Sequence, residues 1–353
     1  MKKLLVDGCI EKSSVQSMAC CLLNATKKIA SSYDITSLVP ANVNFDIASF
    51  NIKKVALPVS RNLWRNLMLP LFACANKEIP FFFPNAMVPN FIPATTPVVT
   101  MISDILPKGN VSAKEEKAYR RKIQASIYSS DVVFVPTQQH KKKLCEEYVV
   151  SNEPVVLGFA SVIDEKYLEL PLTRNNEKYF YIQIEDGNGD GLNELLKMFI
   201  YAHTVGRNKP KLYIVGDLGK VSQELSINID VAEKLGAIRG YNNLSNAQRA
   251  ALIRGAIATL LPSRQYDLPL IHLDAMKCAC PVVTVDIPSV KEVCEDAVIY
   301  SDVRVTEDYK NLLDRLEYDN EYRKETIYKA IYREKMYSWE NAARIFVENL
   351  ESC

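Results

Sequence analysis

Residues 262–302 read PSRQYDLPLIHLDAMKCACPVVTVDIPSVKEVCEDAVIYSD, and this stretch decides the fold. It begins at the end of one apolar run, Ala256–Leu261, and contains two more, Pro281–Val285 and Ala297–Tyr300. Apolar runs without alternation are typical of strands that are covered on both faces. The apolar segment between the first two runs has the length of a helix, so we expect a buried helix there. The stretch therefore predicts a strand end, a helix, a second strand and a loop with acidic side chains.

The same alternation of short apolar runs and longer helical segments extends over the rest of the chain. Helices between such strands imply parallel βαβ units with right-handed crossovers. About five strands in each half predict two doubly wound α/β domains. The polar segment 164–178 breaks the pattern, so we expect domains at 1–165 and 166–336. The other expected strands are Lys3–Asp7, Lys54–Leu57, Pro97–Ile102, Val132–Pro136, Pro154–Leu157, Tyr179–Ile184 and Lys211–Val215.

Two segments of the first half stand out from this pattern. Residues 61–70, RNLWRNLMLP, have helical apolar periodicity and predict a helix that ends at Pro70. Residues 79–97 are rich in Pro, Phe and Asn and predict a long loop, and loops at strand ends usually carry function in such folds. Trp64 and Phe81–Phe83 lie either near the mouth of a binding site or in the core, and the sequence leaves both interpretations open.

The chain has 353 residues and a formal net charge of +1, and 48% of its residues are hydrophobic. These values are typical of a soluble globular protein. No apolar run reaches the roughly 18–20 residues that are needed to span a bilayer. The first residues also lack the apolar core of a signal peptide. We therefore expect a cytoplasmic protein.

Positive charge is concentrated in the first half of the chain. Residues 1–165 contain 19 Lys or Arg and 14 Asp or Glu, whereas the remainder contains 24 and 28. A basic surface suits lipid headgroups or a lipid-linked phosphate, so peripheral contact with the inner face of a membrane is one interpretation. The other is a set of solvated helix faces with many salt bridges. The basic residues include Lys117, Arg120, Arg121, Lys122 and Lys141–Lys143.

The composition argues against several common classes of site. There are 12 glycines, none between Gly8 and Gly109, and the chain contains neither a P-loop nor a G-x-G-x-x-G fingerprint. The nine cysteines form no C-x-x-C pair, which favours buried reduced thiols over a zinc site. A charge near zero, without interleaved basic and aromatic residues, argues against nucleic-acid binding.

Five segments carry a recognisable series of motifs. VVTMISDILP (98–107) is similar to V-x-x-x-H-D-x-x-P, and KLYIVGDLG (211–219) is similar to L-x-I-V-G-x-x-G. GYNNLSNAQRAALIRGAIATLLPS (240–263) is similar to G-Y-x-S-D-x-E-L-x-x-L-Y-x-x-A. Residues 273–302 are similar to L-E-A-M-A-x-G-x-P-V-V followed by E-V-x-x-D-A, and YSWENAARIF (337–346) is similar to a final helix. Over nearly its whole length the chain therefore resembles the retaining glycosyltransferases of the GT-B fold, family 4.

This resemblance implies an architecture and an activity. The GT-B fold has two Rossmann-like domains with a cleft between them, and its last helix, here residues 337–353, crosses back onto the first domain. The second domain of such enzymes holds a nucleoside-diphosphate sugar, and the first holds the acceptor. The implied reaction is transfer of the sugar to a glycan or lipid-linked acceptor with retention at the anomeric carbon. Synthesis of a surface polysaccharide is the usual context for such enzymes.

The family's hallmark is two glutamates separated by seven residues, and the matching positions here are Tyr266 and Asp274. Asp274 is expected to hold the ribose of the donor, because a carboxylate can accept hydrogen bonds from two hydroxyls at once. The alternative for Asp274 is an acid at a helix N-terminus that interacts with the helix dipole. Tyr266 does not supply the negative charge of the first glutamate, and the neighbouring Asp267 would substitute for it only if the loop shifted.

Two other family motifs are altered. The His-Asp pair of the first domain is matched by Ser103-Asp104, and a serine does not carry protons near neutral pH. Asp104 is left to orient a loop or to contact an acceptor hydroxyl. The Arg and Lys that bind the diphosphate are matched by Gly189 and Asp190. Charge builds up on the departing diphosphate, so an acid at this place is expected to repel it.

Three more positions are expected to contact the donor. Arg264 precedes the Tyr266 position and is the candidate cation for the diphosphate, together with backbone amides. Gly216 forms the turn in L-x-I-V-G, and Glu292 matches the acid in E-V-x-x-D-A, where the loop approaches the donor. The resemblance therefore predicts a donor site from Gly216, Arg264, Asp274 and Glu292.

A divalent cation is an alternative source of positive charge for the diphosphate. Residues 186–191 read D-G-N-G-D-G, so Asp186, Asn188 and Asp190 match the first positions of an oxygen-rich calcium loop. The twelfth position of that loop is Lys197 instead of the expected Glu. A strand-to-helix turn that uses Gly for the bend is therefore the favoured interpretation, and we expect no required metal.

The altered positions also support a second function of a different class. A pseudo-glycosyltransferase would keep the fold without its catalysis and act as a partner or binding subunit of another transferase. Four altered positions favour this interpretation, whereas Asp274, Glu292 and the Val215–Gly216 turn favour the enzyme. The four altered positions are Ser103, Gly189, Asp190 and Tyr266.

Overall fold

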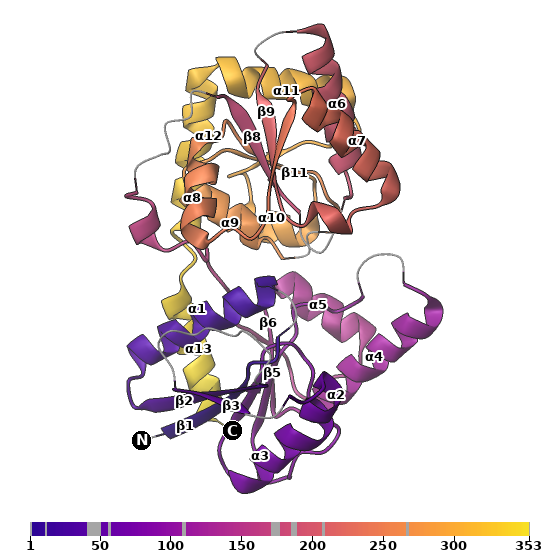
Figure 1. Ribbon diagram of the computed structural model, residues 1–353. Helices are drawn as coiled ribbons and strands as arrows, with labels where there is room; N and C mark the ends of the chain where they lie inside the picture. The colour runs from indigo at the N-terminus through magenta and orange to yellow at the C-terminus, as the bar shows by residue number, and fades with distance from the viewer. Residues whose placement is uncertain are drawn as a thin grey trace. The chain divides into compact units, whose positions relative to one another are not determined.

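The computed structural model describes residues 2–10, 13–40, 51–55, 58–107, 111–170, 177–184, 189–206, 209–265 and 268–352. The chain forms two compact units (Figure 1). Unit 1 comprises Met1–Ala160 and Tyr337–Cys353, and unit 2 comprises Ser161–Met336. The first division thus lies five residues before the expected one, because Ser161 and the Val162 N–H bind Asp274 of unit 2.

Unit 1 is built on a seven-stranded parallel sheet with the strand order β3-β2-β1-β4-β5-β6-β7. Its register pairs Leu5 with Phe81 and Phe82 with Val99. A parallel sheet requires crossover connections, so the helices cover its faces. The strands are β1 Lys2–Asp7, β2 Tyr33–Pro40, β3 Asn51–Val55, β4 Phe81–Phe83, β5 Val98–Met101, β6 Val132–Val135 and β7 Val155–Val156.

The last helix of the chain belongs to unit 1. Helix α13 packs on α1, and its Phe346 inserts into the core, 4.9 Å from Phe82 and 5.4 Å from Phe134 between ring centroids. The end of the chain therefore returns to the first unit, as expected for residues 337–353. The helices of unit 1 are α1 Ser13–Ile29, α2 Arg61–Leu63, the π-turn η1 Trp64–Met68, α3 Leu69–Ala75, α4 Ala113–Tyr128, α5 Gln138–Glu147 and α13 Trp339–Leu350.

Two expectations for unit 1 were wrong. Phe81–Phe83 form strand β4 instead of part of a loop, and all three rings are fully buried. Trp64 is buried as well and donates from Nε1 to Asp7 at 3.2 Å, so these aromatic residues belong to the core. The helix also continues past Pro70 to Ala75. The π-turn lets the Leu69 N–H bond to the Trp64 carbonyl, and Pro70 enters α3 in its first turn, where a missing N–H is tolerated.

Besides β4, two more strands escaped the sequence pattern. Strand β2, YDITSLVP, carries Thr36 and Ser37 in its centre, and both are buried. Strand β10, IRGY, lies at the edge of its sheet and contains an arginine and a glycine, and glycine is depleted in strands. Neither run is continuously apolar, so hydrophobicity alone does not reveal these two strands.

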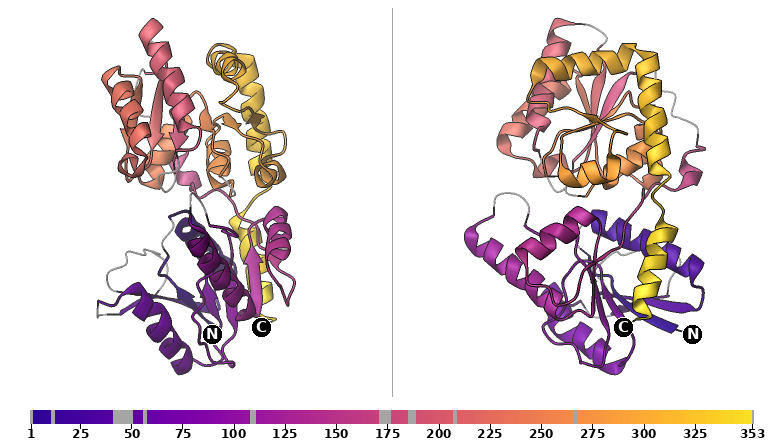
Figure 2. Two further views of the ribbon diagram at one scale, coloured as in Figure 1. Left: turned by 90° about the vertical axis from the view of Figure 1, so that its right-hand side faces the viewer. Right: turned by 180° about the vertical axis from the view of Figure 1, so that it is seen from behind.

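Unit 2 is built on a six-stranded parallel sheet with the order β10-β9-β8-β11-β12-β13. Figure 2 shows helices on both faces of this sheet. The strands are β8 Tyr179–Gln183, β9 Lys211–Val215, β10 Ile238–Tyr241, β11 Thr259–Leu261, β12 Val282–Thr284 and β13 Ile299–Tyr300. The helices are α6 Leu192–Val205, α7 Gln223–Lys234, α8 Asn246–Gly255, α9 Leu270–Lys277, α10 Pro288–Cys294, α11 Thr306–Tyr318 and α12 Asn320–Glu334, with short 3-10 turns at Glu165–Tyr167 and Leu218–Lys220.

The strand order creates one special place in unit 2. From β8 the chain proceeds outward to β9 and β10, whereas from β11 it proceeds in the other direction to β12 and β13. The neighbours β8 and β11 therefore flank the topological switch point, where doubly wound sheets bind ligands at the carboxyl ends of their strands. The buried helix expected after β11 is α9, in which every residue from Leu270 to Met276 is buried.

His272 of α9 and two buried cysteines nearby are structural. His272 Nε2 lies 2.9 Å from Thr284 Oγ1, and burial lowers the pKa of His272 to about 3, so this core histidine stays neutral. Burial also raises the pKa of Cys280 to about 11 and that of Cys294 to about 12. These thiols are therefore protonated and unreactive. Among the helices of the described residues, none is both long enough and apolar enough to cross a membrane.

Candidate donor site at the carboxyl edge of the unit 2 sheet

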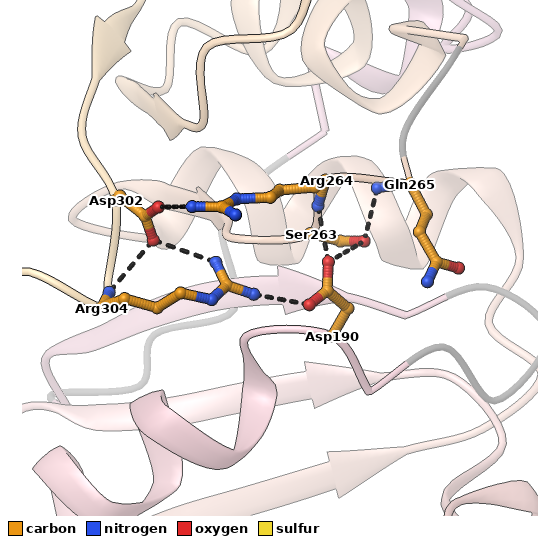
Figure 3. A network of polar contacts seen from close by, with 6 residues as sticks. All are labelled: Asp190, Ser263, Arg264, Gln265, Asp302 and Arg304. Atoms are coloured by element: carbon orange, nitrogen blue, oxygen red, sulfur yellow. Dashed lines mark hydrogen bonds and ion pairs between the residues drawn. The ribbon is translucent and has the colours of Figure 1, made fainter. Parts of the chain in front are cut away.

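Three loops of unit 2 bring polar side chains together at the switch point. Asp190 follows β8, Arg264 follows β11, and Asp302 and Arg304 follow β13. All the strands are parallel, so their carboxyl ends lie at the same edge of the sheet. Figure 3 shows the four side chains and Ser263 joined in one network.

A glycine allows the β8 loop to approach the β11 loop. Gly191 precedes α6 and has a φ of +74°, a conformation that side chains disfavour. A Cβ atom on Gly191 would lie 2.6 Å from Pro262 Cβ and 2.9 Å from the Pro262 carbonyl oxygen. This close approach places the neighbouring Asp190 against Ser263 and Arg264.

The Asp190 carboxylate receives three donors from two other loops. Its Oδ2 accepts from the Arg264 N–H at 2.7 Å and from the Ser263 hydroxyl at 3.3 Å. Its Oδ1 accepts from Arg304 Nη2 at 2.5 Å. Arg304 therefore supplies a cation to Asp190 from the β13 loop, and repulsion of a diphosphate by Asp190 stays a prediction.

Asp302 links the two arginines. Its Oδ1 accepts from the Arg304 N–H at 3.1 Å and from Arg304 Nη1 at 2.9 Å, and its Oδ2 accepts from Arg264 Nη2 at 2.5 Å. Partial burial alone would raise the pKa of Asp302, but the Arg304 N–H and the two guanidinium groups outweigh it and lower the pKa. Asp302 is therefore ionised at neutral pH.

The network is accessible and balanced in charge. Two arginines face two aspartates, and the exposed fraction of the side chain is 63% for Arg264 and 30% for Arg304. Partly exposed ion pairs contribute only about 0–1 kcal/mol each, so an external anion can compete for these guanidinium groups. Guanidinium groups bind phosphate with two parallel hydrogen bonds, which makes this edge suited to a diphosphate.

Asp274 is fully buried and lies in a separate network. Its Oδ1 accepts from the Ser161 hydroxyl at 2.7 Å and from the Val162 N–H at 2.9 Å, and its Oδ2 accepts from Arg249. Burial raises the pKa of Asp274, and the Arg249 guanidinium and the two other donors oppose that rise. With no exposed surface, the carboxylate could meet a ribose only after a donor was displaced. Ribose binding by Asp274 thus stays a prediction, and the dipole alternative is wrong because Asp274 lies in the middle of α9.

Gly216 and Glu292 lie elsewhere in unit 2. Gly216 follows β9 with a φ of +143°, and a Cβ atom there would lie 2.6 Å from the Ile184 carbonyl oxygen. The ends of β8 and β9 are therefore packed so closely that a residue larger than glycine would clash there. Glu292 is half-buried in α10, and its carbonyl accepts from Arg333 Nη2 at 3.0 Å. A role of either residue in donor binding stays a prediction.

Ser103 and Asp104 follow β5 in unit 1. Ser103 is buried, and the half-buried Asp104 accepts a hydrogen bond at its carbonyl from the Tyr119 hydroxyl at 2.8 Å. Burial and the nearby Asp104 raise the pKa of Tyr119, so its hydroxyl remains a donor. This bond to the backbone ties the loop to α4, and a role for the Asp104 side chain stays a prediction.

Four expected site residues, Tyr266, Asp267, Asp186 and Asn188, lie outside the described residues. Within the part of the chain that the structure describes, no three His, Cys, Asp or Glu side chains are grouped to hold a metal ion. Both oxygens of Asp190 already accept hydrogen bonds, so a cation there would have to displace Arg304.

Sequence reasoning found Arg264 and Asp190 but missed Asp302 and Arg304 as their partners. The sequence feature that could have revealed this pair is the Asp-x-Arg triplet that begins two residues after the expected strand Ala297–Tyr300. It also missed Arg249 on α8, which is the ion-pair partner of Asp274.

Solved structures identify this architecture. Residues 173–333 match the family of glycosyl transferases group 1. The chain has the GT-B fold. It is similar to WaaG, a glycosyltransferase involved in lipopolysaccharide biosynthesis, at 13% identity and a TM-score of 0.71, with 99% of each chain covered. No curated protein sequence matches the chain.

Two further structures show the same likeness. Sucrose-phosphate synthase from Thermosynechococcus elongatus is 12% identical, with a TM-score of 0.72, and the match covers 100% of this chain and 99% of that one. The E. coli trehalose-6-phosphate protein bound with UDP-2-fluoro glucose is 10% identical, with a TM-score of 0.70 and the same coverage. The group 1 match falls entirely on unit 2, which contains the Asp190–Arg304 network.

Proposed function

We propose that this chain transfers a sugar from a nucleoside-diphosphate sugar to a glycan or lipid-linked acceptor, with retention at the anomeric carbon. The observation that carries the proposal is the pair of arginines, Arg264 and Arg304, at the switch point of the unit 2 sheet. Doubly wound sheets bind nucleotides at this place. The group 1 match and a neighbour with a bound UDP-sugar analogue support the same ligand class.

The chemistry needs cations at this edge. Transfer breaks the bond between the anomeric carbon and the diphosphate oxygen, and negative charge builds up on the departing diphosphate. Guanidinium groups that are held in place before the reaction stabilise this charge. In the proposal, unit 2 binds the donor through Arg264 and Arg304, unit 1 binds the acceptor, and the product belongs to a surface polysaccharide.

A panel of UDP-, GDP- and ADP-sugars tests the proposal by thermal shift and calorimetry, with and without Mg²⁺, Mn²⁺ and Ca²⁺. Saturable binding of one donor, together with its slow hydrolysis, supports the transferase. The anomeric configuration of the released sugar, followed by NMR, tests retention. A folded protein that binds none of these donors under any condition would contradict the proposal.

A second candidate function is a non-catalytic subunit of another transferase. The specific observation in its favour is that two acids of the expected donor site are already bonded within the protein, Asp190 to Arg304 and Asp274 to Arg249. This candidate predicts no donor hydrolysis and stable co-purification with a second glycosyltransferase. Donor turnover by the purified chain alone would rule it out.

We further propose that unit 1 contacts the inner face of the cytoplasmic membrane. Leu63, Leu67 and Leu71 are spaced four residues apart along α2, η1 and α3, and their exposed fractions are 44%, 47% and 53%. Residues spaced in this way share one side of a helix. The segment 58–77 carries Arg61, Arg65 and Lys77 and no acid, which suits an anionic lipid surface.

This leucine ridge replaces the basic patch as the basis for membrane contact. Arg120 is paired with Glu116 and Glu147, and Lys141 is paired with Glu153, so these two cations of α4 and α5 are compensated within unit 1. Co-sedimentation with vesicles that contain phosphatidylglycerol should fall when Leu67 and Leu71 are both changed to Gln. The matched control is Leu235→Gln, at an exposed leucine of unit 2. Equal sedimentation of all three proteins would contradict this contact.

A further inference from the structure

The donors around Asp190 form a small anion site. A backbone N–H from Arg264, a hydroxyl from Ser263 and a guanidinium from Arg304 converge on one carboxylate. They come from the loops after β11 and β13, whereas the carboxylate comes from the loop after β8. Backbone amides, hydroxyls and arginines are the groups with which proteins bind phosphate.

We infer that Asp190 is an internal stand-in for a phosphate group of the donor, and that it holds Arg304 until the diphosphate replaces it. This inference rests on the proposed function, since it identifies Arg304 as the phosphate-binding cation of that site. Asp190 then acts as a latch that weakens donor binding.

The geometry of Arg304 supports this assignment. Its two terminal nitrogens bind two different carboxylates, Nη1 to Asp302 and Nη2 to Asp190. Asp302 also accepts from the Arg304 N–H, so this carboxylate fixes the arginine, whereas Asp190 holds only one end of its guanidinium. When the Asp190 carboxylate moves away, Arg304 Nη2 loses its acceptor and can donate to a phosphate oxygen. The Asp302 carboxylate still holds the rest of the arginine.

Asp190 lies between two glycines. Gly189 and Gly191 permit backbone conformations that other residues disfavour. A diphosphate brings more negative charge and more acceptor oxygens than one carboxylate, so it can displace the pair. A tethered competitor nevertheless lowers the apparent affinity by the fraction of time for which the site is closed.

Two substitutions distinguish the role of Asp190 as an internal competitor from the role of Arg304 as the phosphate-binding group. In Asp190→Asn the amide oxygen can still accept from the Arg264 N–H and the Ser263 hydroxyl, while its NH₂ group meets Arg304 donor to donor. This variant therefore frees Arg304 with little other change. Arg304→Gln removes the cation and keeps a side chain of similar reach.

Calorimetry with inorganic pyrophosphate and with UDP and GDP measures the effect. We expect Asp190→Asn to bind about tenfold more tightly than the unaltered protein and Arg304→Gln about tenfold more weakly. The double variant should bind as weakly as Arg304→Gln alone, because the latch acts only through Arg304. Arg315→Gln and Glu321→Gln, at exposed ion pairs of α11 and α12, are the matched controls and should bind normally.

Asp190→Asn and Arg304→Gln are expected to change the affinity for pyrophosphate in opposite directions. Unchanged or weaker pyrophosphate binding by folded Asp190→Asn overturns the inference, as does its failure to bind pyrophosphate at all, because a purely structural ion pair gives those results. If pyrophosphate binding follows the expected order but no nucleotide binds to any variant, the anion site stands and the proposed function fails. Thermal melting of every variant shows which of them are folded.

Discussion

Asp190 stands where the family that the chain resembles has a cation, and Arg304 brings a positive charge to the same place from another loop. The charge of the site is therefore set by which loops meet and not by one position. The same holds for Asp274, whose carboxylate is neutralised by Arg249 and two further donors. At the scale of the residue, the chemistry of a motif position can be predicted only when the groups that contact its side chain are known.

Arg249→Met tests the buried pair. Removing the arginine leaves the buried Asp274 carboxylate without its cation, and such changes cost about 3–5 kcal/mol of unfolding free energy. The pKa of Asp274, already raised by burial, rises further. The native state then binds a proton that the unfolded state has released, so the loss grows as pH rises above the unfolded pKa. Urea unfolding at pH 5 and pH 8 should show the larger loss at pH 8.

The control for this pair is Arg315→Met, at an exposed arginine of α11. It should change stability by no more than about 0.5 kcal/mol at either pH. A loss for Arg249→Met that is small, or equal at both pH values, would show that Asp274 is not held as an ion.

At the scale of the element, the β8–α6 turn and the α2–η1–α3 helix show how local chemistry shapes larger parts. Gly191 allows the turn to pass close to Pro262, which brings two loops into one network. The π-turn carries the helix past Pro70 and leaves three leucines on its outer side. In both cases a local feature, one glycine or one π-turn, determines the course of the backbone over the neighbouring residues.

Gly191→Ala tests the turn. The new Cβ would lie 2.6 Å from Pro262 Cβ, and alanine disfavours the φ of +74°, so we expect a loss of about 1–3 kcal/mol. The loops should also move apart, and pyrophosphate binding should weaken with them. Gly236→Ala has the same kind of φ, +68°, but open space around the added Cβ, and separates the backbone strain from the steric clash. Equal behaviour of the two variants would argue against the importance of the close approach.

At the scale of the whole molecule, the two units share one architecture but differ in whether they include the end of the chain. Each has a doubly wound parallel sheet, but only unit 1 takes up the end of the chain, through α13. Phe346 is fully buried among the aromatic residues of the unit 1 core. The chain terminus is therefore part of that core.

Phe346→Ala tests this role. Deletion of a buried phenylalanine typically costs about 3–5 kcal/mol. We expect the urea transition reported by unit 1 to move to lower urea, and limited proteolysis to cleave near α13. Phe91→Ala removes a ring that is 64% exposed and serves as the control. If both variants unfold at the same urea concentration as the unaltered protein, α13 is not a structural part of unit 1.

The sequence determined the fold class because continuous apolar runs and the spacing of helices are local properties. It predicted the strand, buried helix and second strand of residues 262–302, and the return of the last helix, but the loop that it expected after the second strand contains helix α10. It missed β4, which it assigned to a loop, β2, whose Thr36 and Ser37 are buried by their neighbours in the sheet, and β10, an edge strand whose Arg239 and Gly240 are exposed.

The charge of the candidate site was decided by the tertiary structure alone. Asp190 and Arg304 are 114 residues apart in sequence and form an ion pair only because β8 and β13 end at the same edge. Asp274 and Ser161 are 113 residues apart and meet in the same way. Hydrophobic patterning specifies which segments are strands, whereas the pairing of charges depends on the order of those strands in the sheet.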